Sequence, residues 1–320
     1  MTEQPMLFRF RSYGVPLLAW VLLDVALVGQ SLVPGPEALI RSGITVKVSP
    51  HVYVIPDNGV QLVPNVGIIV GSRGTLVVDT GLGPINAQTI LREVDKVKRG
   101  TDLYVVSTHY HPEHAVGEMS FPESATVLRT RAQQQDIDEL GLDSLLRFRS
   151  ISPLIEELLV GAAYRDADIV FQRDYALDLG DVHVQLMAWG PTHTRGDTMV
   201  FVEDDDVLLA GDVVMNQRFL VFMSQESSVE IWLSVLDDLV ALEPKHIVPS
   251  HGQMGDIALI HEQRTYLRTL RARVREHKLA GHTLDEIVGQ ITLEMQSNYP
   301  NWVGERWISG AARSAFREAP

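Results

Sequence analysis

The sequence contains no cysteine among its 320 residues. Disulfide bridges, thiolate nucleophiles and cysteine metal ligands are therefore excluded, although this absence does not identify a redox compartment. Basic residues are also scarce, since 27 Lys and Arg stand against 41 Asp and Glu, and the net charge is −14. Nucleic acids are bound through basic surfaces, and no tract rich in Lys or Arg is present. We therefore expect no nucleic-acid partner.

Long hydrophobic runs are absent as well. The apolar stretch at residues 15–28 is too short for a comfortable membrane span, so we expect no stable one. Two arginines precede this stretch and a Pro-Gly-Pro sequence follows it, an order typical of a secretory signal. Asp24 interrupts it, and no clean cleavage site is visible. Residues 1–36 are interpreted either as the signal peptide of a periplasmic or secreted protein, or as an N-terminal helix of a cytoplasmic one.

The rest of the chain alternates between strand-like and helix-like segments. A β-rich region is expected at 44–80, a helix at 85–97, a strand at 103–107 and largely helical structure at 129–166. The later segments are expected to be strands at 175–177, 182–186, 199–202, 207–210 and 247–249, and helices at 229–242, 257–279 and after a capping box at Thr283 and Glu286. This order favours an α/β fold with two sheets and helices outside them.

The most informative segment is His109-Tyr110-His111-Pro112-Glu113-His114, which brings three imidazoles and a carboxylate into six positions. It directly follows an expected strand. Because side chains alternate along a strand, His109 and His111 point to the same side and can reach one metal ion. Glu113 and His114 follow where the chain turns and can reach a second ion beside the first. Histidine nitrogen and carboxylate oxygen are typical zinc ligands.

Other strand ends carry an Asp or a His. His193 lies in a glycine-punctuated loop, and Asp212 and His251 each follow an apolar strand. Asp79 also ends a strand, and we expect it to fix a histidine ring, because metal-bound imidazoles usually donate their other N–H to an acceptor. Taken alone, His193 is better explained as a loop histidine without a role, and Asp212 is explained equally well as a helix or turn cap. Together with the histidine-rich segment, they indicate a metal centre at the ends of the strands.

This set of motifs resembles the metallo-β-lactamase-fold superfamily of metallohydrolases, over about residues 44–256. All five motif positions of that family have matches here, namely Asp79, the group His109, His111, Glu113 and His114, then His193, Asp212 and His251. The resemblance implies a four-layer αββα sandwich of two mixed sheets with outer helices. We accordingly expect the fold domain at 37–256 and a C-terminal helical extension at 257–320, packed on the same domain.

The resemblance also implies a role for each motif residue. His109, His111 and His193 would hold a first metal, Glu113, His114 and His251 a second, and Asp212 would bridge the two. Two zinc ions are expected, with iron or manganese as alternatives. The family usually has Asp where this chain has Glu113, whose side chain is one methylene longer. Glu113 either binds the second metal through an adjusted backbone, leaves the second site weak, or accepts a metal other than zinc.

The implied activity is hydrolysis of an ester, thioester, lactone or amide of a small molecule, by a hydroxide held between the metals. Asp212, Glu113 and Asp79 would act closest to the reaction. β-Lactam hydrolysis is the main alternative, and a non-catalytic metal-binding protein of the same fold is an alternative from another class. The segment His-x-His-Pro-Glu-His and the N-terminal stretch are most similar to exported metallohydrolases associated with quinoprotein systems.

Outside the metal motifs, two segments and two basic residues are candidates for substrate contacts. The Met- and Phe-rich stretch at 213–228 either lines the mouth of the site or packs beneath the following helix. The segment at 129–166 is expected to form a wall or lid. Arg195 and Lys245 either meet an anionic group or are simply solvated. The C-terminal helices are interpreted as packing elements or as the interface of a homo-oligomer.

Overall fold

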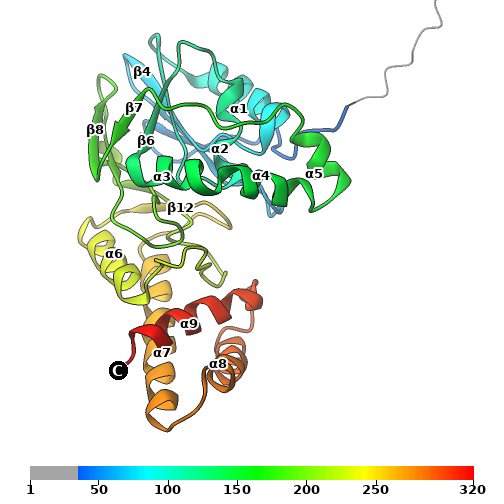
Figure 1. Ribbon diagram of the computed structural model, residues 1–320. Coiled ribbons are helices and arrows are strands. Elements are labelled where there is room, and N and C mark those ends of the chain that lie inside the picture. Colours follow the sequence, from blue (N-terminus) through cyan, green and yellow to red (C-terminus); the bar gives the residue numbers. More distant parts are fainter. Residues whose placement is uncertain (1–34) are drawn as a thin grey trace, which may run out of the picture. The chain divides into compact units, whose positions relative to one another are not determined.

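The computed structural model describes residues 35–320 (Figure 1). The expected signal peptide or N-terminal helix at 1–36 lies almost entirely outside the described residues. The predicted periplasmic or secreted location depends on the same residues and stays a prediction. Within the described part of the chain, no helix is both long and apolar enough to cross a membrane.

The first sheet has seven strands, which lie side by side in chain order. The strands β1 to β4 pair antiparallel, and β4 to β7 pair parallel. Their bounds are β1 (Val46–Lys47), β2 (Val52–Ile55), β3 (Val66–Val70), β4 (Gly74–Val78), β5 (Asp102–Val106), β6 (Thr126–Thr130) and β7 (Ile169–Phe171). Every residue of β3 and β4 is buried, which explains their continuous apolar runs. Helix α1 (Gly83–Val97) covers the outer face through Ile90 and Val94.

The second sheet has five strands in the order β12-β11-β10-β9-β8. Their bounds are β8 (Asp174–Asp178), β9 (His183–Met187), β10 (Met199–Val202), β11 (Val207–Gly211) and β12 (His246–Pro249). Its inner face packs against the first sheet, where Val78 and Val106 share one apolar cluster with Val200 and Leu209. Helix α6 (Val229–Ala241) covers its outer face. The predicted αββα sandwich of two mixed sheets is therefore confirmed.

Helices α7 (Ala258–Leu279), α8 (Leu284–Asn298) and α9 (Ile308–Glu318) follow and lie together beside α6 (Figure 1). One apolar cluster joins them, since Trp232 of α6 belongs to the same buried cluster as Tyr266, Ile291 and Ala312. The capping box is present, because the Thr283 side chain accepts from the backbone N–H of Glu286 and the Glu286 carboxylate accepts from that of Thr283. The expected C-terminal helical extension is thus confirmed.

The prediction of largely helical structure at 129–166 is wrong at its start, and strands β6 and β7 were missed. The helical part consists of α3 (Arg131–Asp136), a π-turn (Ile137–Gly141), α4 (Leu142–Arg149) and α5 (Pro153–Leu158). The apolar pattern of β6 is broken by Arg129, which is buried in an ion pair with Glu118. Only one of the three residues of β7 is buried, so this short edge strand has no readable alternation.

Candidate metal centre

The ends of four strands deliver polar side chains to one edge of the sandwich. Asp79 follows β4, His109 comes three residues after β5, Asp212 follows β11, and His251 comes two residues after β12. The loop between β9 and β10 adds His193. The strand ends lie very close together, because a Cβ at Gly211 would stand 3.0 Å from that of Thr108 and the Gly211 φ is +57°. A larger residue there would push the segments carrying His109 and Asp212 apart.

A short helix, α2 (Pro112–Ala115), begins directly after His111 and carries Glu113 and His114. All the candidate ligands except His251 are buried. They form three groups whose ligand atoms lie within 4.8 Å of one another. The first is His109, His111 and His193, the second is Glu113, His114 and His251, and a third, His109, His114 and Asp212, shares one residue with each of them. The structure therefore brings together the side chains that the sequence singled out, and the third group links the other two.

Three imidazole nitrogens converge in the first group. His111 Nδ1 lies 3.0 Å from His109 Nε2 and 3.1 Å from His193 Nε2. The backbone carbonyl of Val221 accepts from His193 Nδ1 at 2.6 Å, so the Nε2 atom of the neutral ring keeps a free lone pair. Zn–N distances of about 2.0–2.1 Å in a tetrahedron place ligand nitrogens roughly 3.3 Å apart. The spacing in this group fits such an ion.

Two histidines of the second group, like His193, donate a hydrogen bond from Nδ1. His114 Nδ1 donates to Asp79 Oδ2 at 2.9 Å, and His251 Nδ1 donates to the Val63 carbonyl at 3.0 Å. Both Nε2 atoms consequently face inward. Asp79 also accepts from the Thr108 backbone N–H at 2.7 Å, and it adopts a left-handed φ of +67°, a conformation found at functional sites. Asp79 thus contacts a histidine ring and stays out of both ligand groups.

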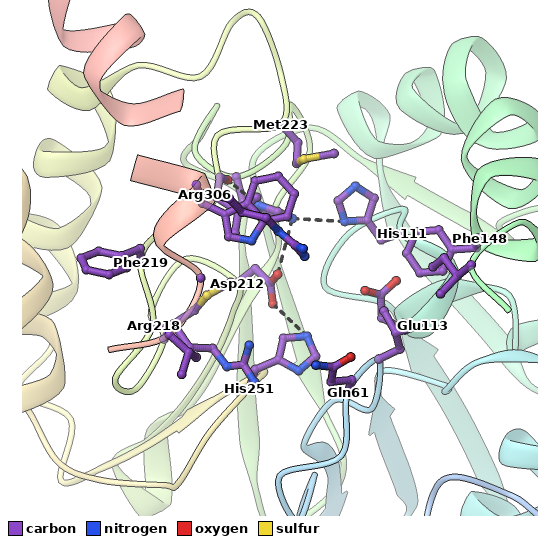
Figure 2. A pocket seen from close by; sticks show the side chains of 18 of the residues that line it. Gln61, His111, Glu113, Phe148, Asp212, Arg218, Phe219, Met223, His251 and Arg306 are labelled. Atoms are coloured by element: carbon purple, nitrogen blue, oxygen red, sulfur yellow. Dashed lines mark hydrogen bonds and ion pairs between the residues drawn. The ribbon is translucent and has the colours of Figure 1, made fainter. Parts of the chain in front are cut away.

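The carboxylate of Asp212 lies between the two groups (Figure 2). Its Oδ2 is 3.4 Å from His193 Nε2, and its Oδ1 is 3.8 Å from His251 Nε2 and 4.0 Å from His114 Nε2. One oxygen therefore faces each group. This placement suits a carboxylate that contacts two cations.

Three buried atoms on the side of the second group have no hydrogen-bond partner within residues 35–320. They are Glu113 Oε2, His114 Nε2 and Asp212 Oδ1. Leaving a buried polar atom unpaired costs about 1–3 kcal/mol, and native structures contain few such atoms. Their convergence at one point is accounted for by a cation that all three bind. The longer side chain of Glu113 reaches this point, so the donor set fits a metal.

Burial and the neighbouring imidazoles determine the charges of these side chains. Burial, together with the adjacent histidines, lowers the pKa of His109 and His111 well below the usual value, which leaves both rings neutral and able to bind metal. Burial raises the pKa of Glu113 to about 7. Burial also acts to raise the pKa of Asp212, but His251 and His193 outweigh it and hold that pKa at about 2.

His114 behaves differently from the other histidines. Burial lowers its pKa, but the carboxylate of Asp79 more than compensates and brings the pKa to about 9. In the absence of a cation, the ring is therefore protonated at neutral pH, and a metal bound at Nε2 would take the place of that proton.

Two buried carboxylates that sequence reasoning missed support the loops of the site. Asp197 accepts from the Thr194 backbone N–H at 2.9 Å and from the Thr192 and Thr194 hydroxyls, which fixes the loop of His193. Glu118 accepts from Ser107 Oγ at 2.6 Å beneath the histidine-rich segment and pairs with Arg129. Glu118 lies outside the motifs and contacts Arg129 of strand β6, so no local pattern reveals it. Asp197 contacts residues only three and five positions before it, within the loop of His193.

A cavity of about 470 Å³ opens above the candidate ligands. The segment at 129–166 supplies one wall through Phe148 and Ile151, as expected for a wall or lid. Both interpretations of the stretch at 213–228 apply, because Met215 and Met223 line the cavity while Phe222 packs on Trp232 at 4.7 Å between ring centroids.

The C-terminal extension supplies a wall of the cavity, a role that its interpretation as packing elements or an oligomer interface did not include. Val303, Gly304, Arg306 and Trp307 all line the cavity. Arg195 and Lys245 do not line it, since Arg195 pairs with Asp136 at 2.8 Å and Lys245 pairs with Asp206 at 2.6 Å.

Comparison with known proteins agrees with this geometry. The model of the metallo-beta-lactamase superfamily matches residues 59–251, which is more than half of the chain. The chain belongs to this superfamily. Its membership confirms the resemblance drawn from the motif residues, and superfamily members are metal-dependent hydrolases.

Several individual members of the metallo-beta-lactamase superfamily are similar to the chain. A linear primary-alkylsulfatase of Pseudomonas sp. (strain ATCC 19151) is 24% identical over 306 residues, covering 76% of this chain and 56% of that protein. The human acyl-coenzyme A thioesterase MBLAC2 is 23% identical over 198 residues, covering 58% of this chain and 70% of that protein. The chain thus spans little more than half the length of the alkylsulfatase.

Solved structures of the superfamily share the fold. The sec-alkylsulfatase Pisa1 from Pseudomonas sp. aligns with a TM-score of 0.65 and 15% identity, over 86% of this chain and 50% of that one. A metallo-beta-lactamase from Pontibacter korlensis aligns with a TM-score of 0.56 and 18% identity, over 70% of this chain and 98% of that one. The alignment with the alkylsulfatase therefore extends over more of this chain than the alignment with the β-lactamase.

Proposed function

We propose that this protein is a hydrolase that uses two divalent metal ions, with zinc as the usual occupant. One ion would be held by His109, His111 and His193, and the other by Glu113, His114 and His251, with Asp212 facing both. The observation that carries the proposal is the convergence of unpartnered buried atoms on Glu113, His114 and Asp212. Membership of a superfamily of metal-dependent hydrolases supports the same conclusion.

When bound, such ions bring the pKa of a shared water into the neutral range and polarise the oxygen of a carbonyl or sulfuryl group. The reaction adds water across the bond between the acyl or sulfuryl group and its leaving atom. The hydroxyl goes to the acyl or sulfuryl group, and the proton goes to the leaving group. This chemistry needs no cysteine nucleophile, and the chain has none.

The protein's own side chains supply orientation and charge. Asp79 and the Val63 carbonyl hold the rings of His114 and His251 with their Nε2 atoms facing inward. Asp212, with its pKa at about 2, stays ionised throughout the neutral range and keeps negative charge between the two groups. The apolar walls of the cavity limit the access of water to the bond that breaks.

The first candidate substrate is an ester or thioester. It is supported by the similar proteins, which are named as an alkylsulfatase and an acyl-coenzyme A thioesterase. β-Lactam hydrolysis is the second candidate, favoured by alignments over 98% of the length of solved metallo-beta-lactamases. Turnover of a chromogenic cephalosporin separates the two, because a rate near background would remove the β-lactam.

The test compares protein as purified, protein treated with a chelator and protein reconstituted with zinc. We expect two metal ions per chain by elemental analysis, and hydrolysis of a panel of esters, thioesters and sulfate esters that is lost on chelation and restored by zinc. His111→Ala should abolish turnover while the circular dichroism spectrum stays unchanged. The matched control is His183→Ala, which removes an exposed histidine paired with Asp204. Metal uptake without turnover of any substrate would favour a non-catalytic metal-binding protein.

A further inference from the structure

Positive charge gathers at the mouth of the cavity. Apart from the candidate metal ligands, the charged residues that line it are Arg147, Arg218 and Arg306, with no further Asp or Glu. This bias is unexpected in a chain with 41 acidic and 27 basic residues. The arginines on the wall thus carry a charge opposite to the net charge of the whole protein. Their positive potential attracts anions to the cavity.

These three guanidinium groups have no carboxylate partner within residues 35–320. Other arginines of the described chain do have such partners, for example Arg195 with Asp136 and Arg273 with Glu294. The guanidinium of Arg306 instead lies 4.7 Å from the ring centroid of Trp307, which itself lines the cavity. Their hydrogen-bonding capacity is therefore free for a ligand.

Two of the arginines come from segments that are paired with each other. The backbone N–H of Phe219 donates to the Val303 carbonyl at 3.1 Å, and that of Val303 donates to the Gln217 carbonyl at 3.0 Å. This bridge fixes the loop that carries Arg218 against the segment that leads to Arg306. Figure 2 shows both side chains on the side of the cavity opposite Glu113 and Phe148.

Buried Gln263 of α7 adds a second constraint on this wall. Its side-chain amide donates to the carbonyls of Met215 at 2.7 Å and Arg218 at 3.2 Å. The backbone that carries the Arg218 guanidinium is thereby held from two directions. The arginine wall is a formed part of the fold.

Apart from Gln61 and Ser144, the remaining walls are apolar. Phe148 and Ile151 line the cavity on the side of α4, and Phe219, Val221 and Met223 line it on the side of the loop. An alkyl or acyl chain placed against them removes its surface from water, which stabilises the complex by about 25 cal/mol per Å².

We propose that the substrate is an anionic amphiphile, whose anionic group is bound by Arg218, Arg306 and Arg147 and whose hydrocarbon part lies against the apolar walls. This inference rests on the proposed hydrolase function. A planar guanidinium binds sulfate, carboxylate and phosphate oxygens through paired hydrogen bonds, so the shared chemistry is an oxyanion on a hydrocarbon chain. Arg306 lies outside residues 59–251, so the superfamily match does not itself imply this wall.

Binding to the full chain with its metals tests the inference without requiring turnover. The probes are octyl sulfate, decanoate and neutral octanol, each below its micelle concentration, measured by calorimetry and by tryptophan fluorescence. We expect both anions to bind more tightly than octanol, and Arg306→Ala and Arg218→Ala each to weaken anion binding about three- to tenfold. Octanol binding should change little, and Arg306→Lys should restore part of the loss.

The matched control is Arg271→Ala, which removes an exposed arginine of α7 that does not line the cavity. It should leave the binding of all three probes unchanged. A larger arginine-dependent effect for octyl sulfate than for decanoate would identify a sulfate as the anionic group, and the reverse would identify a carboxylate.

Two outcomes distinguish this inference from the proposed hydrolase function. Anion affinity that is unchanged in both alanine variants, and lost only on chelation, would overturn the arginine wall and leave the hydrolase proposal intact. Arginine-dependent anion binding in a protein that hydrolyses no member of the substrate panel would support the wall and overturn the hydrolase.

Discussion

If the protein binds two metals as proposed, replacing Asp79 with Asn should weaken the site of Glu113, His114 and His251 while the fold is preserved. Asn has nearly the same shape, and its oxygen can still accept from the Thr108 backbone N–H, now at 2.7 Å from Asp79 Oδ1. Its NH2 group then faces His114 Nδ1, which lies 2.9 Å from Asp79 Oδ2. An NH2 group only donates, so the neutral His114 ring must accept at Nδ1 and carry its proton at Nε2. That proton blocks the lone pair that faces Glu113 and His251.

The expected loss of metal affinity follows from the role of carboxylates that orient metal-binding histidines without binding the metal. Loss of a carboxylate that orients a metal-binding histidine typically costs ten- to a hundredfold in metal affinity or activity, or about 1.4–2.8 kcal/mol. We expect Asp79→Asn protein dialysed against zinc buffers to show this weakening at one of its two sites only. Elemental analysis against free zinc concentration measures it, and circular dichroism checks that the protein is folded.

A matched control comes from a second Asp–His pair at the other end of β11. Asp205 Oδ1 lies 3.0 Å from His51 Nδ1, and neither residue lines the cavity. Asp205→Asn should therefore leave zinc binding unchanged. Zinc affinities in Asp79→Asn that equal those of the unchanged protein would refute the reasoning, because they would mean that the tautomer of His114 does not govern the second site.

Three further predictions concern stability. Trp232→Ala should lower the free energy of unfolding by about 3–5 kcal/mol in urea titrations, because the fully buried indole joins α6 to the C-terminal helices; a loss below 1 kcal/mol would contradict this packing. Hydrogen bonds to Asp205 outweigh its burial and lower its pKa, so its contribution to stability is present above about pH 4 and is lost as pH falls through the folded-state pKa. In thermal melts between pH 7 and 2, the melting temperature of Asp205→Asn should therefore fall less steeply with decreasing pH than that of the unchanged protein. An equally steep fall would argue against this. The Glu318 carboxylate accepts from the first two backbone N–H groups of α6, at 2.7 and 3.1 Å, so Glu318→Ala should cost about 1 kcal/mol in urea titrations, and Glu318→Gln less.

Much of the ligand cluster could be predicted from the sequence because Asp212 and His251 closely follow apolar strands, and His109 begins the histidine-rich segment after another. The strands β3, β4, β11 and β12 are almost wholly buried, and such strands appear as uninterrupted apolar runs. Parallel neighbours end at the same edge of a sheet, so the polar residues that follow them meet there. The position of Asp79 at a strand end also predicted that it accepts from a histidine ring, and in the structure it accepts from His114.

The missed features depend on contacts between distant segments. Arg129 in β6 is buried with its guanidinium donating to Glu118, Gln134 and the Arg165 carbonyl, and nothing in the local pattern of β6 indicates these partners. The wall formed by Val303 and Arg306 depends on a bridge to a loop more than 80 residues earlier in the chain. Periodicity identifies the face that an element buries, but it does not identify the segment that will cover it.

The tethering of the loop at 213–228 has a consequence for the thermodynamics of binding. Gln263 and the bridge to Val303 hold this loop by its backbone, although it contains no regular secondary structure. A ligand that enters the cavity therefore meets a surface that is already ordered, and the conformational entropy of the loop is lost during folding instead of during binding. More of the contact energy is then retained as affinity, and the cavity is selective by shape before any ligand arrives.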